Sequence, residues 1–202
     1  MNEPALLAAL AYQNLLWLVD GATPVHIGLL QTGSHLGPGA WASLTPGVAP
    51  CRLPVEGVGV GGGGIDTLII AGLEGHLTEG STSLTDLLFR CKVCLAPGGR
   101  LIATGRNAAW VGRQPVGSPA EAWSMTDVRR SLERAGFTRC SVYYLQAYPG
   151  PIHAAVPAWA PAAAAYERLQ MPTPGWGRLR SLVARFGGHR LLYPGFMMIG
   201  YV

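Results

Sequence analysis

Short apolar runs alternate with segments of helical length along this chain. Val25–Leu30, Asp66–Ala71 and Arg100–Thr104 predict strands, and the continuous apolar character of the second indicates that both of its faces are covered. Between the last two runs, Ser81-Thr82-Ser83 can cap a predicted helix that runs through Leu95 and has an apolar stripe at three- and four-residue spacing. Strand, helix and strand in this order predict a β-α-β unit, because parallel strands need a crossover to return to the same edge.

The remaining pattern predicts further helices and strands around this unit. The predicted helices cover residues 4–19, Met125–Ala135, Ala162–Gln170 and Trp176–Phe186, and the predicted strands cover Cys51–Val55, Thr138–Ala147 and Phe196–Val202. Pro54 argues against a central position for the first of these strands. Residues 149–161 predict a proline-rich loop. We expect one domain over residues 1–202, with an N-terminal helix over 1–20 and a helical insertion over 149–190 before the last strand.

The chain is poor in charge for its length. Of its 202 residues, 49% are hydrophobic and 13% are charged, whereas soluble domains usually carry about 25% charged residues. Either a partner covers part of the surface, or the core is large and the loops are rich in alanine and glycine. The first interpretation, a covered surface, predicts a protein partner or a homo-oligomer.

The charge is also uneven along the chain. Residues 1–75 carry one base, Arg52, and five acids, whereas the remainder carries fourteen bases and six acids. Fourteen of the fifteen bases are arginine, and Lys92 is the exception. No cluster of bases interleaved with aromatic residues occurs, so we expect no nucleic-acid partner.

Cysteine use and hydropathy bear on metal sites and location. Cys91 and Cys94 have CxxC spacing, but no second pair or histidine is spaced to complete a zinc site, so buried thiols are favoured over a metal or redox site. Residues 4–19 are too short to span a bilayer and lack the basic start of a signal peptide. We expect no metal, no membrane span and a cytoplasmic location.

Three motifs in sequence order carry a family resemblance. Leu73-Glu74-Gly75-His76-Leu77 follows a predicted strand, Leu95-x-Pro97-Gly98-Gly99-x-Leu101 introduces the next, and Ala135-Gly136-Phe137 leads to a later one. This order resembles the second half of the class I S-adenosylmethionine-dependent methyltransferases, over about residues 65–202. The resemblance implies an α/β, Rossmann-like fold: a mostly parallel sheet with helices on both faces and an antiparallel last strand.

The first half departs from that family's pattern. The family holds its cofactor with an acid and a Gly-x-Gly turn after the first strand, and with an acid at the end of the second. Here Leu30 is followed by glycines without an acid, and Glu56 is the only acid at a plausible second strand end. The chain from Leu30 to Asp66 also looks too short for the usual two further β-α units. We therefore predict a truncated or eroded first half, and the candidate cofactor-binding residues are Gly28, Gly33, Glu56, Ala71 and Gly72.

Candidate catalytic and substrate residues follow from positions at strand ends, where ligands bind in α/β folds. His76 and Glu74 are weak candidates for a base, and the alternative is that they cap the next loop. Arg106 and Asn107 could meet an anionic substrate. Tyr143 and Tyr144 could line an acceptor pocket, although aromatic residues in strands more often pack within the sheet.

Two functions from different classes follow. The first is a methyltransferase-like pseudoenzyme that binds no cofactor and serves as a binding or scaffold subunit. The alternative is an active enzyme that uses S-adenosylmethionine to methylate a small-molecule acceptor through a diverged cofactor loop. The missing acids, the short first half and the charge-poor composition favour the pseudoenzyme, whereas the strand-end motifs favour the enzyme.

Overall fold

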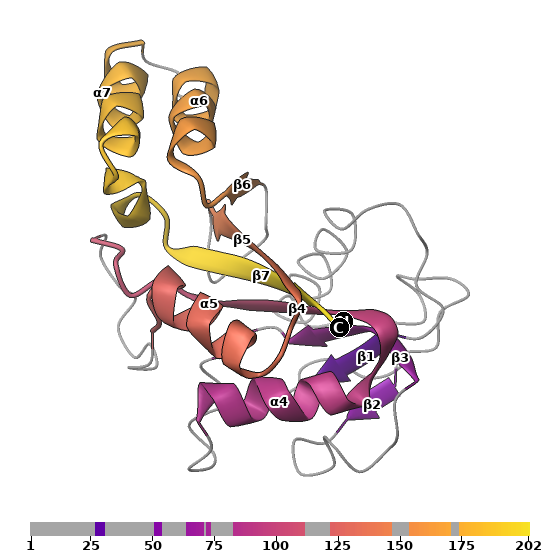
Figure 1. Cartoon of the computed structure of the whole chain (residues 1–202). Helices are drawn as coiled ribbons and strands as arrows, with labels where there is room; N and C mark the ends of the chain where they lie inside the picture. The colour runs from indigo at the N-terminus through magenta and orange to yellow at the C-terminus, as the bar shows by residue number, and fades with distance from the viewer. Residues whose placement is uncertain are drawn as a thin grey trace, which may run out of the picture.

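The computed structural model describes residues 27–30, 51–53, 64–70, 72–73, 83–111, 122–146, 154–170 and 174–202. Within this part, seven strands form one sheet in the order β2-β1-β3-β4-β7-β5-β6 (Figure 1). The strands are β1 (Ile27–Leu30), β2 (Cys51–Leu53), β3 (Ile65–Ile70), β4 (Leu95–Arg106), β5 (Arg139–Leu145), β6 (Ala155–Pro157) and β7 (Gly195–Tyr201). The pairings make β2, β1, β3, β4 and β5 run in one direction, with β7 and β6 opposed. The Rossmann-like α/β class and the antiparallel last strand are confirmed.

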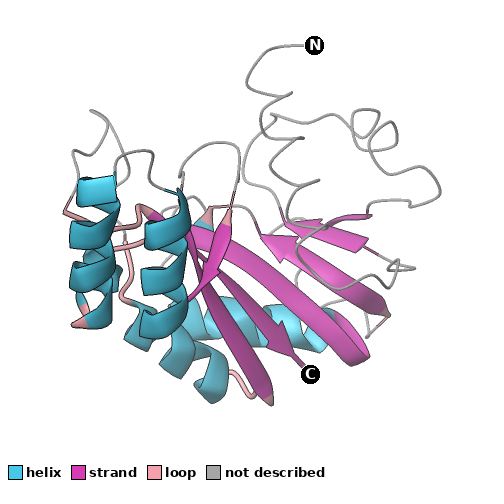
Figure 2. Cartoon of the chain, turned by 90° about the horizontal axis from the view of Figure 1, so that it is seen from above, coloured by secondary structure: helices cyan, strands magenta, loops and turns pink. Residues whose placement is uncertain are grey.

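Four α-helices and a short 3-10 helix accompany the described strands. They are α4 (Leu84–Cys94), α5 (Met125–Arg134), α6 (Ala160–Gln170), α7 (Pro174–Arg185) and η2 (Gly188–Leu191). The helices α4 and α5 lie next to one another against the sheet, whereas α6 and α7 form a hairpin that projects near β5 and β6 (Figures 1 and 2). None of the helices in the described ranges is long and apolar enough to cross a membrane.

Local capping explains where α4 and α5 begin. Ser83 accepts a hydrogen bond from the Asp86 backbone N–H, and Ser124 accepts one from the Asp127 N–H, both at 3.2 Å. Each serine hydroxyl also lies within hydrogen-bond distance of the carboxylate that follows it by three residues. The two aspartates sit in first turns, where the helix dipole favours negative charge. Both starts agree with the sequence prediction.

The predicted β-α-β unit is present as β3, α4 and β4. Its parallel register runs from Thr67 opposite Arg100 to Ile70 opposite Ala103. The predicted helix end at Leu95, shortly before Pro97-Gly98-Gly99, is one residue late, because α4 stops at Cys94 and β4 begins at the next residue. The tripeptide lies in an irregularity of β4: Ile65 pairs with Leu95 but Thr67 with Arg100, so the residues between are accommodated by a bulge.

Aliphatic residues from the central strands and from α4 and α5 make the main core. Leu68, Leu88, Leu101 and Met198 are each fully buried there. Phe196 on β7 packs so closely on β4 that a Cβ at Gly105 would lie 2.7 Å from its ring. This core fixes β7 between β4 and β5 and thereby places the strand ends that form the candidate site.

The segment between β5 and β7 differs from the prediction at its start. Residues 149–161 include the short strand β6, which pairs with β5 through Tyr144 opposite Val156. Pro157 ends this strand, which is an edge strand and therefore tolerates proline. The predicted helices over 162–170 and 176–186 are confirmed as α6 and α7 with shifted starts. The predicted helix over residues 1–20 lies outside the described residues.

The described part of the first half contains β1 and β2. Gly28 on β1 pairs with Cys51 on β2 and with Leu68 on β3. The strand β2 lies at the edge of the sheet, as Pro54 predicted. Residues 31–50 and 54–63 are outside the described ranges, so truncation of this half stays a prediction.

Candidate functional site

The carboxyl ends of β3 and β4 are the place where a doubly wound sheet binds ligands. Gly72 follows β3 and has a φ of 76°, which favours glycine over any residue with a side chain. Its backbone N–H donates a hydrogen bond of 3.1 Å to Oγ1 of Thr104 on β4. Thr104 is buried. The residue after β3 is thus hydrogen-bonded to the neighbouring strand β4. Because glycine has no Cβ, a ligand could approach the backbone at Gly72 closely.

The structure places two of the five predicted cofactor residues. Gly72 lies at the strand end, and Gly28 lies within β1, paired on both sides. The candidates Gly33, Glu56 and Ala71 are outside the described residues, as are Glu74 and His76. Their roles therefore stay predictions.

Arg106, the last residue of β4, and Asn107, which follows it, are the predicted anion-binding residues, and both are buried. The Asn107 side-chain nitrogen donates to the carbonyl oxygens of Arg190 at 2.7 Å and Tyr193 at 2.9 Å. Its side-chain oxygen accepts from the Ala109 N–H at 3.1 Å. The Asn107 amide thus holds the chain that leads into β7, a use that its position in the sequence did not reveal.

The two candidate tyrosines do not come together. Adjacent residues of a strand point to opposite faces, so Tyr143 and Tyr144 cannot line one pocket side by side. The ring of Tyr144 is buried and stacks on Tyr193, with centroids 5.1 Å apart, and meets the ring of His189 edge-on. Burial raises the pKa of Tyr144 to about 12. Tyr144 thus packs against η2 and the start of β7, and it also lines a cavity beside η2, whereas Tyr143 does not line that cavity.

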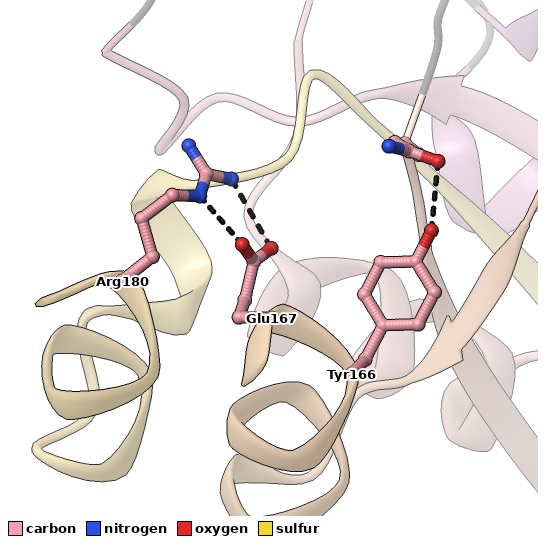
Figure 3. Close-up of polar contacts among 4 residues, drawn as sticks. Tyr166, Glu167 and Arg180 are labelled. Carbon is pink, nitrogen blue, oxygen red and sulfur yellow. Dashed lines mark hydrogen bonds and ion pairs between the residues drawn. The ribbon is translucent and has the colours of Figure 1, made fainter. Parts of the chain in front are cut away.

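A buried ion pair joins α6 to α7, and sequence reasoning missed it. The Arg180 guanidinium donates through Nε and Nη2 to the two carboxylate oxygens of Glu167 (Figure 3). Glu167 is 1% exposed. The hydrogen bond to Glu167 raises the pKa of Arg180. The one available signal was that Glu167 is the only acid after Glu133.

Beside this pair, Tyr166 on α6 donates a hydrogen bond of 2.7 Å to the Gln146 side chain just after β5 (Figure 3). Burial raises the pKa of Tyr193, and the nearby Glu167 carboxylate raises it further. The hairpin is therefore fixed to the sheet by polar contacts as well as by packing.

A cavity of about 310 Å³ lies between α5, β5 and η2. Its polar lining includes Thr126, Arg129, Tyr144, His189 and Arg190. Burial lowers the pKa of His189, and the charge of Arg190 adds to this effect, whereas a hydrogen bond to the Ala184 carbonyl opposes it. Arg129 is already paired with Glu133 at 2.9 Å. The lining thus places His189, whose pKa is lowered, beside two arginines, and the described lining residues include no carboxylate.

The CxxC cysteines are core residues of α4. Cys91 and Cys94 are both buried in the main hydrophobic core, which agrees with the prediction that they are buried thiols. Burial and, to a lesser extent, the nearby Cys94 together raise the pKa of Cys91 to about 12. A thiol with so high a pKa is a poor nucleophile and metal ligand at neutral pH. Among the described side chains, no group of three or more His, Cys, Asp or Glu residues gathers to hold a metal ion.

No model of a known protein family matches the chain. No curated protein matches it in sequence. Many solved structures do match it in fold.

A possible histamine N-methyltransferase from Thermotoga maritima, described as S-adenosylmethionine-dependent, matches with a TM-score of 0.55 and 11% identity over 98% of this chain and 90% of that one. An S-adenosylmethionine-dependent methyltransferase from Archaeoglobus fulgidus matches with a TM-score of 0.53 and 10% identity over 98% and 94%. The [4+2]-cyclase SpnF matches with a TM-score of 0.50 and 12% identity over 96% and 80%. At such low identity the likeness concerns the fold alone. Together with the strand order, it shows that this chain has the Rossmann-like fold of the class I S-adenosylmethionine-dependent methyltransferases.

Proposed function

We propose that this protein is a cytoplasmic binding or scaffold module built on the methyltransferase fold, without methyl-transfer activity of its own. Its partner in this proposal is another protein or a second copy of the chain. The observation that carries the proposal is that the Asn107 side chain, at the end of β4, is committed to backbone hydrogen bonds.

An acceptor site needs polar groups that are free to meet a substrate. Asn107 has its side-chain nitrogen committed to two backbone carbonyls and its oxygen to a backbone N–H. Tyr144 lines the cavity between α5, β5 and η2, but its ring is held in place by Tyr193 and His189. Freeing either side chain for a substrate would leave buried polar or aromatic groups without their present contacts, which costs stability.

The sequence supports the same proposal from the cofactor side. No acid follows the first strand, and the carboxylate that would hold the ribose hydroxyls has only Glu56 as a candidate. The match to a [4+2]-cyclase illustrates that a similar fold can accompany a differently named activity. The low content of charged residues, 13%, supports a covered protein surface.

A second candidate is an active S-adenosylmethionine-dependent methyltransferase on a small-molecule acceptor, and Gly72 favours it. The positive φ of Gly72 and its bond to Thr104 give the exit of β3 a fixed backbone that a cofactor could approach closely. In this candidate the cofactor would supply the methyl group. Gly28, Gly33, Glu56, Ala71 and Gly72 would hold it, with Glu74 or His76 as the base.

Calorimetric titration of the full chain with S-adenosylmethionine and with S-adenosylhomocysteine separates the two candidates. The proposal predicts no saturable heat with either compound up to about 1 mM, a concentration that detects binding free energies of about −4 kcal/mol. Micromolar binding that is lost in Gly72→Val would establish the second candidate instead. The solution mass of the chain tests the proposed partner, because a dimer would support a second copy of the chain as that partner. A monomer that also captures no other protein from a lysate of its source counts against the scaffold proposal.

A further inference from the structure

The outward face of α7 carries large apolar side chains that nothing in the described structure covers. Eleven large apolar side chains are exposed among the described residues, and eight of them lie between Trp159 and Leu191. Five belong to α7 or follow it directly: Trp176, Leu179, Leu182, Val183 and Phe186. We call these five residues the α7 stripe.

Helical geometry places the α7 stripe on one side of the helix. At 3.6 residues per turn, the five positions fall within a sector of about 120°. Phe186 continues the helical geometry, because its N–H donates to the Leu182 carbonyl at 3.2 Å. The other side of α7 presents Gly177, Ser181 and Ala184, which are buried. Helix α7 therefore packs through small residues and turns its large apolar residues to the outside.

Arginines lie along both margins of the α7 stripe. Arg178 and Arg185 are exposed on one margin, and Arg180, bound to Glu167, lies on the other. Residues 154–202 contain five arginines and one acid, Glu167, which is buried and paired. The exposed side of α7 is thus apolar at its centre, positive at the margin formed by Arg178 and Arg185, and without a negative side chain of its own.

We propose that the α7 stripe is a contact surface for an anionic lipid bilayer, on which α7 lies parallel to the membrane plane. An amphipathic helix with Trp, Phe and Leu on one face and arginine beside them is the pattern that enters the headgroup region. Arginine can extend to lipid phosphates while its aliphatic part rests on apolar surface. Tryptophan favours the membrane interface.

The shape of the molecule and the signs of its charges favour a bilayer over other occupants. Helix α7 is the outer helix of a hairpin that stands away from the sheet (Figure 1), so the hairpin offers a ridge to a flat, deformable surface. A second copy docking through the same stripe would bring arginines of like sign together. The proposal does not depend on whether the chain binds a cofactor.

Sedimentation of the full chain with vesicles tests the proposal. Vesicles of phosphatidylcholine with phosphatidylglycerol should bind the protein, vesicles of phosphatidylcholine alone should bind it much more weakly, and salt should release it. The double variant Trp176→Ser/Phe186→Ser should bind at least about tenfold more weakly, because two large apolar groups no longer enter the bilayer. Arg178→Gln and Arg185→Gln should each cost about fivefold, the equivalent of about 1 kcal/mol per basic residue near an anionic surface.

Phe89→Ser on α4 is the matched control, because Phe89 and Trp176 are both 56% exposed. It should leave vesicle binding unchanged. The proposal is overturned if the wild type does not bind anionic vesicles, or if Phe89→Ser weakens binding as much as the α7 variants do. It is also overturned if the wild type is a dimer that Trp176→Ser/Phe186→Ser converts to monomers without vesicles, since the stripe then serves a second copy. Circular dichroism verifies that each variant is folded. If Trp176→Ser/Phe186→Ser misfolds, the arginine variants still test whether the α7 stripe binds anionic vesicles.

Discussion

The sheet body and the α6–α7 hairpin of this molecule are held together in different ways. In the body, Leu68, Leu88 and Leu101 are fully buried, and α4 and α5 close over them. In the hairpin, the helices meet through small residues such as Ala163 and Ala184, and large apolar side chains point outward. Large apolar residues thus stabilise the fold in the sheet body, whereas in the hairpin they are exposed and available for contact with another surface.

The hairpin compensates for its small core with specific polar contacts. Glu167 and Arg180 pair within it, Tyr166 reaches Gln146, and the Asn107 amide holds the chain around Tyr193. Hydrogen bonds and ion pairs depend on direction, whereas apolar burial depends mainly on area. The hairpin's position therefore depends on a few directed contacts, and loss of those made by the buried Glu167 and Asn107 side chains should affect it most.

The largest expected effect is the loss of a core aromatic. Phe196→Ala should lower the free energy of unfolding by about 3–5 kcal/mol, because the Phe196 side chain on β7 is fully buried and packs on Gly105 of β4. Phe186→Ala, on the outward face and 83% exposed, should change it by less than about 0.5 kcal/mol. Urea unfolding of the two variants measures both values. Equal effects would show that the α7 stripe is covered within the folded chain.

The ion pair of the hairpin comes next. Arg180→Ala should lower the free energy of unfolding by about 3 kcal/mol, because the buried Glu167 carboxylate is left without its cation. Arg178→Ala removes the same charge from the exposed part of α7 and should cost less than about 0.5 kcal/mol. Thermal and urea unfolding compare them. A negligible effect of Arg180→Ala would mean that the hairpin does not rely on the pair.

A smaller loss is expected at the end of β4. Asn107→Ala should cost about 2 kcal/mol, because the carbonyls of Arg190 and Tyr193 lose their buried donor. The exposed Gln146→Ala, which removes the partner of Tyr166, serves as the comparison and should cost less than about 0.5 kcal/mol. Hydrogen exchange should show faster exchange in residues 188–194 for Asn107→Ala alone. An unchanged exchange rate there would argue that Asn107 is free for another role.

The smallest effect concerns pH. Burial lowers the pKa of His189, so the folded protein binds this proton less readily than the unfolded chain does. Stability linked to His189 is therefore complete above the unfolded value of about 6.5 and is lost as the pH falls below it. His189→Asn should remove that part of the pH dependence of unfolding between about pH 7.5 and 5.5. A variant with the full wild-type dependence would place the titration at another group.

Much of the fold followed from local patterns. The β3-α4-β4 unit was predictable because apolar periodicity and the Ser83 cap act over a few residues. The strand β6 was not, because three residues become a strand only through pairing with β5. The bulge in β4 depends on the register against Ile65, which lies far away in the sequence.

The site residues were harder to predict than the fold. The position of Asn107 at a strand end was read correctly, but its partners Arg190 and Tyr193 lie more than eighty residues further along the chain. For Tyr144 the sequence allows either a pocket or packing, and the structure shows both: its ring packs on Tyr193 and His189, and it lines the cavity beside η2. The outward orientation of the α7 stripe was unpredictable because an apolar helical stripe usually faces a core.

Hydrogen exchange of the full chain with and without S-adenosylmethionine at about 1 mM tests the proposed function most directly, because it reports on Gly72 and the ends of β3 and β4 themselves. The account predicts the same exchange rates in both conditions around these strand ends. Slower exchange around Gly72 with the cofactor, abolished in Gly72→Val, would contradict it.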